Sequence, residues 1–510
     1  MRGLGRLPRR PPRWLILGLL VAAIELSYVF IITAGTFTHW STWNANYDLQ
    51  AEGFRSGHLY LPIAPARELL DQRNPYDWSN VRLWFWDASL YKAHYYLYWG
   101  PFPALVLAGI KTVFRMHAQV GDQFPIFGFY TIYLLAGALL IDRMARRLFP
   151  QIGLPLVGLA IAVFAYANPT PYMLATPGIY EAAIAGAQAF LILGLVFAFD
   201  VVWAPERPRS ARCLLIAAGT CWGIAIACRV SAGPPVLLLV LATVLRAAPR
   251  GPARLARLTR AAGLLAGPVA LWVGALLAYN KARFESWFEF GMKYQLNTLP
   301  FLTSWRFLPA NIYSYLLRPL GTSCRFPFVW ALRDIGARGF PRGYRIPAGY
   351  ATAEPLAGLL PTAPSIAFGA VALVLAAKQA VAWRGVSRGD QAPASQRARA
   401  SAFCAVAFAV LGTTTLFPVL PLCAATMRYL ADIGGGVVLF ALWGAWSLIA
   451  CCGGRPWWRR GAIVTFVALG GATLILGILL GFQGYDEMFR QHNAPLYQRL
   501  AASLSFCRAR

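Results

Sequence analysis

Charge is scarce in this chain of 510 residues, since Asp, Glu, Lys and Arg together make up only 13% of it. Soluble domains carry about 25% charged residues. The shortage excludes a large soluble protein. Together with 58% hydrophobic residues, it predicts a polytopic membrane protein.

Acidic residues are the scarcest of the charged types, with 20 Asp and Glu against 47 Lys and Arg. Most of the basic residues are arginines, and they lie in short clusters between apolar runs. A nucleic-acid-binding protein would gather them on one domain, so no nucleic acid is expected as a partner. The clusters are instead interpreted as determinants of membrane topology.

Paired cysteine motifs are also missing. The nine cysteines show no C-x-x-C spacing and are predicted to be small residues buried in the membrane. No small-residue cleavage site follows the first apolar run, which is therefore predicted to be an uncleaved first span.

Apolar runs of membrane length are abundant. They occur at about 14–35, 98–115, 123–141, 152–168, 180–203, 212–228, 232–247, 261–280, 357–381, 402–423, 433–451 and 461–482. The pattern predicts a single integral-membrane domain, 1–510, formed by an all-α bundle of about 11–13 transmembrane helices.

Arginines in the short loops predict the orientation. Arg2, Arg6, Arg9, Arg10 and Arg13 place the N-terminus in the cytoplasm. The first long polar segment, 36–97, and the second, 281–355, are then outer loops that face the outside. Later clusters at 143–147, 207–212, 246–260, 384–399 and 455–460 are expected in the cytoplasm.

One conflict remains in this topology. If the runs at 98–115 and 123–141 both cross, the cluster at 143–147 emerges on the wrong side. Either one of these runs does not cross fully, or a further span lies within 36–97.

The first outer loop opens on an acidic stretch just past the first span. Residues 48–59 have the spacing of a short amphipathic helix in the membrane interface. Asp48 and Glu52 are four residues apart and so share one face of that helix. A carboxylate at this depth is costly unless it has a partner or a function, which makes Asp48 the candidate catalytic residue.

Other charged residues are expected at the same membrane face: Lys92, Glu181, Arg229 and Arg428. Cations of this kind bind phosphate, and a carboxylate can deprotonate a hydroxyl or hold a metal. Asp87 is also acidic, but for Asp87 and Glu52 a salt-bridged interfacial role is an equal alternative. For Glu181 and Arg229, simple placement at a span end competes.

Two motifs carry a resemblance to a known family. They are Tyr47-Asp48-x-x-Ala51-Glu52-Gly53-Phe54 and Leu90-Tyr91-Lys92-x-x-Tyr95-Tyr96-Leu97-Tyr98-Trp99-Gly100-Pro101. The first outer loop therefore resembles that of GT-C membrane glycosyltransferases, the group of the protein O-mannosyltransferases and aminoarabinose transferases. The chain looks like an uncharacterised bacterial branch of that superfamily.

The resemblance implies an inverting transfer of a sugar from a polyprenyl-phosphate donor to a lipid, glycan or protein acceptor. It places the reaction on the outer face of the bacterial cytoplasmic membrane, among membrane lipids. Asp48 matches the acid that acts as base or metal ligand. Lys92, Glu181 and Arg229 match substrate-binding positions of the family. Glu52 and Arg428 are predicted to bind substrate as well.

The cofactor is left open by the sequence. The usual Asp-Glu pair is Asp48-Leu49 here, which favours a base over a metal ligand, although a divalent cation remains an alternative. The competing function is a lipid-linked-sugar flippase or another multi-pass transporter. It would show charges near the bilayer midplane and internal symmetry, and no clear half-to-half repeat is present.

The Asp48 hypothesis makes a direct prediction. Asp48→Asn should abolish transfer without loss of membrane insertion, because the amide cannot accept the hydroxyl proton. Transfer is measured with a radiolabelled polyprenyl-phosphate sugar. Retained transfer by the inserted variant contradicts the assignment.

Overall fold

The computed structural model describes residues 11–40, 42, 44–167, 169–204, 208–247, 253–297, 302–333, 339–352, 354–385, 393–485 and 487–507. Arg2, Arg6, Arg9 and Arg10, on which the N-terminal orientation depends, lie outside these residues, as do parts of the clusters at 207–212, 246–260 and 384–399.

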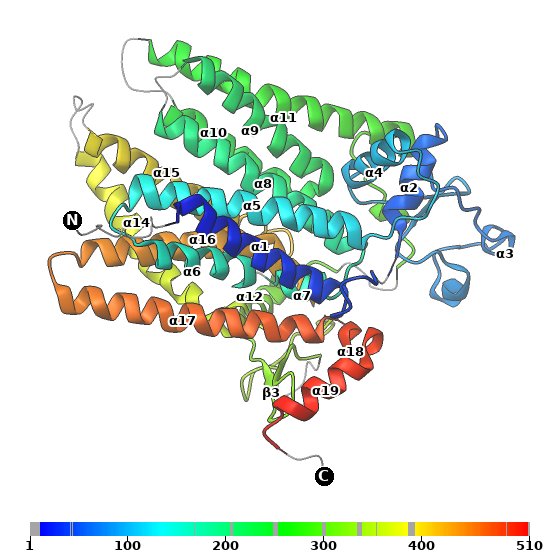
Figure 1. Ribbon diagram of the computed structural model, residues 1–510. Coiled ribbons are helices and arrows are strands. Elements are labelled where there is room, and N and C mark those ends of the chain that lie inside the picture. Colours follow the sequence, from blue (N-terminus) through cyan, green and yellow to red (C-terminus); the bar gives the residue numbers. More distant parts are fainter. Residues whose placement is uncertain are drawn as a thin grey trace, which may run out of the picture.

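Long apolar helices make up most of the molecule (Figure 1). Within the described residues, eight are long and apolar enough to cross a membrane. They are α1 (Arg13–Ile32), α5 (Gln123–Leu148), α8 (Ile179–Trp203), α9 (Pro208–Cys228), α10 (Gly233–Ala247) together with the short turn before it, α11 (Arg254–Phe284), α16 (Arg428–Cys451) and α17 (Pro456–Gln483). The predicted class, an all-α polytopic membrane protein, is confirmed.

Four other apolar runs also form helices. They are α4 (Phe102–Val113), α6 (Leu154–Ala167), α14 (Phe368–Gly385) and α15 (Pro393–Thr413). Except for α4, these helices run alongside the long ones in the bundle (Figure 1).

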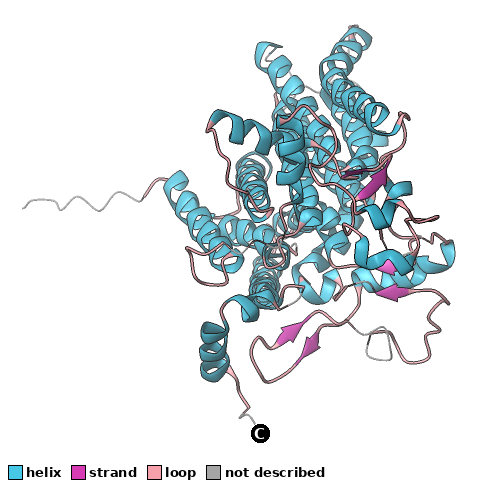
Figure 2. Ribbon diagram, turned by 90° about the vertical axis from the view of Figure 1, so that its right-hand side faces the viewer, coloured by secondary structure: helices cyan, strands magenta, loops and turns pink. Residues whose placement is uncertain are grey.

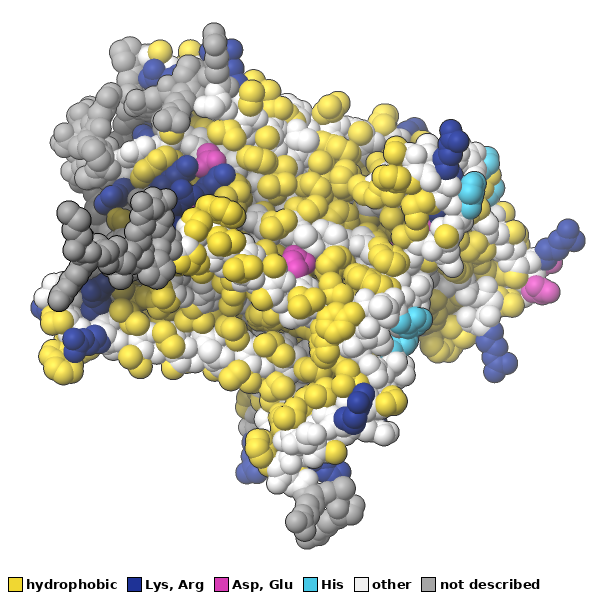
Figure 3. Space-filling view, viewed as in Figure 1, with side chains coloured by type: hydrophobic (Ala, Val, Ile, Leu, Met, Phe, Trp, Pro, Cys, Tyr) yellow, Lys and Arg dark blue, Asp and Glu magenta, His cyan; other side chains and the backbone are white. Residues whose placement is uncertain are grey.

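Ion pairs identify one end of the bundle. Arg13 at the start of α1 binds Asp142 near the end of α5 at 2.7 Å, and Arg147 binds Asp200 of α8 at 2.6 Å. These contacts place the start of α1 beside the ends of α5 and α8. We call this the basic end. Figure 3 shows hydrophobic side chains over the middle of the bundle, with most Lys and Arg side chains toward its ends.

The topology conflict is resolved at α4. This helix has 12 residues, which span about 18 Å, whereas the hydrocarbon layer is about 30 Å thick. The run at 98–115 therefore does not cross, and α5 returns the chain to the basic end. The first of the two alternatives holds.

The first long polar segment folds against the opposite end of the bundle (Figure 1). It contains α2 (Asn46–Arg55), α3 (Arg67–Leu70), η1 (Trp78–Leu83), β1 (Ser89–Tyr91) and β2 (His94–Tyr96). β1 and β2 form an antiparallel hairpin whose turn residues, Lys92 and Ala93, both have positive φ, as a two-residue turn requires.

Three aromatic residues of this segment lie inside the fold rather than on its surface. Tyr95, Tyr96 and Trp99 are buried, at 2%, 8% and 4% exposure. They pack inside the folded segment because the hairpin and the start of α4 turn them inward.

The second long segment and the short connecting elements join the bundle helices along the chain. They comprise α7 (Thr170–Leu174), η2 (Val230–Ala232), η3 (Met292–Tyr294), η4 (Trp305–Phe307), α12 (Leu308–Leu316), β3 (Gly321–Thr322), β4 (Val329–Trp330), β5 (Ala351–Thr352), α13 (Leu359–Thr362), η5 (Pro364–Ala367) and β6 (Ala424–Ala425). The two long segments touch each other, since Leu296 donates its backbone N–H to Ala88 at 2.8 Å.

The C-terminal helices α18 (Met488–His492) and α19 (Ala494–Leu504) follow α17. Viewed along the bundle, they and the β3–β4 hairpin lie at its edge (Figure 2). A disulfide joins Cys324 to Cys507, with Cα atoms 5.6 Å apart. The prediction that the cysteines are unpaired membrane residues is therefore wrong for these two, because residues far apart in sequence meet only in the fold.

Candidate functional site

A cavity of about 690 Å³ opens at the end of the bundle opposite the basic end. Its walls come from both long polar segments and from the first turns of α8 and α16. The lining residues are Asn44, Asn46, Phe85, Trp86, Asp87, Tyr172, Thr176, Gly178, Ile179, Tyr180, Glu181, Asn297, Glu354, Arg428 and Tyr485.

Asp87 is held in the cavity by hydrogen bonds. Gln295 and Asn297 donate their side-chain amides to its Oδ1 at 3.2 and 3.1 Å. Its backbone has φ +63°, a conformation that is uncommon for residues other than glycine and often marks a functional position. Burial raises the pKa of the Asp87 carboxyl, although the Tyr180 hydroxyl and Arg428 oppose the shift.

Arg428 is the cation of the cavity wall, the sole one among its described lining residues. Its guanidinium pairs with Glu354 at 2.7 Å and stacks on Tyr180, with 3.6 Å from the guanidinium carbon to the ring centroid. The Nε atom is buried and has no hydrogen-bond partner. An unpaired buried donor costs free energy, so this N–H is available to a ligand.

Glu181 adds a second acid in the first turn of α8, and its side chain is 7% exposed. The N-termini of α8 and α16 both reach the cavity. Their free N–H groups and helix dipoles favour negative charge there.

Rings and amides complete the wall. Amide side chains donate and accept hydrogen bonds with hydroxyl groups, and flat aromatic faces pack against apolar C–H surfaces. This combination suits a sugar ring. The residues are Asn44, Asn46, Asn297, Phe85, Trp86, Tyr172, Tyr180 and Tyr485.

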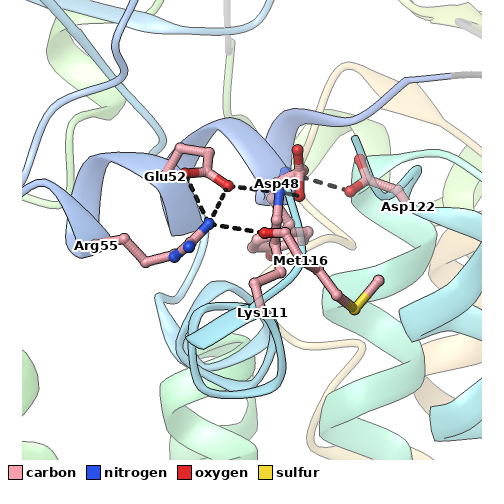
Figure 4. Close-up of polar contacts among 7 residues, drawn as sticks. Asp48, Glu52, Arg55, Lys111, Met116 and Asp122 are labelled. Atoms are coloured by element: carbon pink, nitrogen blue, oxygen red, sulfur yellow. Dashed lines mark hydrogen bonds and ion pairs between the residues drawn. The ribbon is translucent and has the colours of Figure 1, made fainter. Parts of the chain in front are cut away.

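Asp48 does not line the cavity. It is 3% exposed and forms an ion pair with Lys111 of α4, with 2.6 Å between Nζ and Oδ1 (Figure 4). The same ammonium group contacts Glu52 at 2.5 Å, and Arg55 contacts Glu52 at 2.8 Å. The expected shared face of Asp48 and Glu52 is confirmed, and both acids serve to dock α2 on α4.

Asp122 connects this network to the start of α2. Its carboxylate accepts hydrogen bonds from the backbone N–H groups of Asn46 and Tyr47, both at 3.2 Å. These bonds cap a helix that lacks a cap of its own. Burial raises the pKa of Asp122 to about 8. Because Asn46 lines the cavity, Asp122 helps to fix that part of the wall.

Lys92 lies away from the cavity, at the turn of the β1–β2 hairpin. Its side chain is 60% exposed and pairs with Glu285. The hydrogen bond that its ammonium group donates to the Glu285 carboxylate raises the pKa of Lys92. The structure therefore separates this residue from the other expected phosphate ligands.

Arg229 lies behind the cavity wall and is not one of the lining residues. It binds Asp432 at 2.8 Å, and its guanidinium carbon lies 5.8 Å from the centroid of Tyr429, the neighbour of Arg428. Its buried Nε also lacks a partner.

Of the expected site residues, the structure thus brings Glu181 and Arg428 together in one cavity. Asp48 and Glu52 form a neighbouring buried network, Arg229 lies behind the wall, and Lys92 is on the surface. Asp87 and Glu354 were not among the proposed site residues. The signal for Asp87 was an acid inside a run of aromatics, whereas Glu354 had no local signal.

A preformed metal centre is not evident. In the described part of the chain, no group of three or more His, Cys, Asp or Glu lies close enough to hold a metal ion.

The fold and the cavity define an integral-membrane protein with a polar site that opens at one end of a helical bundle. No family model and no curated protein matches the sequence. Two similar solved structures are a crystal structure of the Archaeoglobus fulgidus oligosaccharyltransferase in the apo form and ArnT from Cupriavidus metallidurans bound to undecaprenyl phosphate.

These are likenesses in helical arrangement between distant sequences. The oligosaccharyltransferase match has a TM-score of 0.46 at 12% identity and covers 91% of this chain and 56% of that one. The ArnT match has a TM-score of 0.39 at 12% identity and covers 94% and 78%. The chain thus spans little more than half the length of the oligosaccharyltransferase.

The Asp48 network makes a prediction about stability. Lys111→Met should lower the free energy of unfolding by about 3–5 kcal/mol, because it leaves the buried Asp48 charge without a partner. Thermal unfolding of the purified protein in detergent measures this. The double variant with Asp48→Asn should recover most of the loss, and equal stability of Lys111→Met and the wild type would contradict the prediction.

Proposed function

We propose that the chain is an inverting glycosyltransferase that takes a sugar from a polyprenyl-phosphate donor. The observation that carries this proposal is the cavity, where Asp87 and Arg428 lie among rings and amides suited to a sugar. A donor sugar and an acceptor hydroxyl both fit in about 690 Å³, and the donor's lipid remains in the bilayer.

In this mechanism the acceptor oxygen attacks the anomeric carbon. A bond forms between that oxygen and the carbon, and the bond from the carbon to the phosphate oxygen breaks, with its electron pair leaving on the phosphate. The acceptor proton passes to Asp87. Arg428 and the helix N-termini stabilise the negative charge that develops on the phosphate.

We assign the role of base to Asp87 rather than Asp48. A base must have a lone pair that can reach the substrate, and Asp87 lines the cavity with a pKa that burial raises. The Asp48 carboxylate is already bound by Lys111. Glu181 and Arg428 keep their predicted substrate-binding role, Glu52 supports α2, and Arg229 supports the wall through Asp432.

A transporter is the less favoured alternative. Secondary transporters bind their substrate near the bilayer midplane between repeats. The cavity here lies at one end of the bundle, built from loop residues and the first turns of helices.

Asp87→Asn should lower transfer by about 10²–10⁴-fold, the usual contribution of a general base. Transfer is measured with a radiolabelled polyprenyl-phosphate sugar, with Asp71→Asn, an exposed residue of the same segment, as the matched control. In the wild type, activity should fall as the pH is lowered, and the fall should begin at a higher pH than for an ordinary aspartate. The reason is that the raised pKa of Asp87 lets the base become protonated at a higher pH. Full activity of Asp87→Asn together with an inactive, stable Asp48→Asn would move the base to Asp48.

We also propose that the cavity faces the outside of the bacterial cytoplasmic membrane. The Cys324–Cys507 disulfide supports this orientation, because structural disulfides persist in oxidising compartments. The disulfide joins the second long segment to the chain after α19. The second long segment in turn touches the first, which lines the cavity. The basic end then lies in the cytoplasm, as the positive-inside rule requires.

The orientation can be measured by cysteine labelling. In intact cells, Cys507→Ser should expose the Cys324 thiol to a membrane-impermeant maleimide, because Cys324 lies on the surface. Cys451, exposed at the basic end, should react only after the cells are permeabilised. The reverse pattern would place the cavity in the cytoplasm.

A further inference from the structure

Arg428, the cation of the cavity wall, is already engaged in an ion pair with Glu354. The Arg428 side chain is 16% exposed and that of Glu354 is 11% exposed, and they meet at 2.7 Å. Glu354 follows β5, which pairs in parallel with β6, and β6 lies just before Arg428. The same two-strand contact therefore brings the acid and the arginine together.

The charge balance of the cavity is unfavourable for an anion. Its described lining residues include three carboxylates, Asp87, Glu181 and Glu354, against the single cation Arg428. Like charges in a partly dry site repel strongly. Glu354 directly contacts the guanidinium. Any phosphate that binds Arg428 is therefore repelled by this carboxylate and must compete with it.

The two phosphates of the proposed reaction differ in charge. The donor is a phosphodiester with one negative charge. The product, polyprenyl phosphate, is a monoester with a charge of about −1.5 to −2 at pH 7. A fixed carboxylate beside the phosphate therefore opposes the product more than it opposes the donor.

We propose that Glu354 competes with the lipid phosphate for Arg428 and thereby promotes release of the polyprenyl phosphate product. This inference rests on the proposed function. Glu354 is a positioning residue in this scheme: it holds Arg428 flat on Tyr180 in the empty cavity and re-forms the ion pair when the product leaves. The Nε atom of Arg428 is buried and has no hydrogen-bond partner, so it is a further donor for a phosphate that has displaced Glu354.

Glu354→Gln tests the competition, because it removes the charge and keeps an amide that can hydrogen-bond Arg428. The probe is undecaprenyl phosphate, titrated into the purified protein in detergent. Its dissociation constant should fall about tenfold, within the usual 5–150-fold range of coupling between two sites. In transfer assays the variant should show a lower KM for the donor, a lower kcat and stronger inhibition by added undecaprenyl phosphate.

Three controls separate this role from a structural one. Glu354→Asp keeps the charge and should bind undecaprenyl phosphate like the wild type. Glu487→Gln removes an exposed acid that pairs with Arg490 and should change nothing. Inorganic phosphate should show the same direction of change in Glu354→Gln, since recognition lies in the headgroup.

The binding experiment requires no transfer, so the two proposals can fail separately. Unchanged or weaker binding of undecaprenyl phosphate by a folded Glu354→Gln overturns the competition. Tighter binding by Glu354→Gln, in a protein whose wild type transfers no sugar from any polyprenyl-phosphate donor, supports the competition and overturns the proposed function.

Discussion

A hydrocarbon layer about 30 Å thick is the constraint on which the rest of the structure depends, because it penalises every unpaired charge inside it. Acids and bases of this chain therefore gather at the two ends of the bundle. At the basic end, aspartates pair with arginines, as in Arg13–Asp142. At the other end, the same rule allows charged groups to collect around a polar cavity that lies outside the hydrocarbon layer.

Buried ion pairs at the cavity end divide the acids into two kinds. The Asp48 carboxylate is neutralised by Lys111, and this pair fixes α2 on a helix too short to cross the membrane. Asp87 is held by amides and a hydroxyl instead, so it keeps a charge that a substrate can use. Both acids come from the first long segment, but only the partner residues show which is structural.

The sequence predicts the helices well because each one depends on its own residues. The run at 14–35 became α1, and the run at 433–451 became α16. The run at 98–115 was harder to interpret, because its apolar residues suggest a membrane span although it contains Lys111. In the structure the charge of Lys111 is buried against Asp48, so α4 is not a simple membrane span.

The cavity was less predictable, since its lining residues come from seven separate parts of the chain. Glu181 and Arg428 start their helices and so could be placed near one face by topology alone. Glu354 has no periodicity or motif around it, and its position depends on a two-residue pairing of β5 with β6. The same holds for Cys324 and Cys507, which are 183 residues apart in sequence.

An acidic cavity is an unexpected place for the proposed phosphate donor to bind, but it follows from the path of the proposed reaction. Tight binding of both the donor and the product phosphate would raise the barrier to turnover, because uniform binding does not accelerate the chemical step. In the proposed reaction, the one arginine of the cavity wall is shared with Glu354, so it offers a charge for the transition state without retaining the product. The helix N-termini of α8 and α16 supply the remaining positive potential from fixed backbone groups, which need no counter-charge of their own.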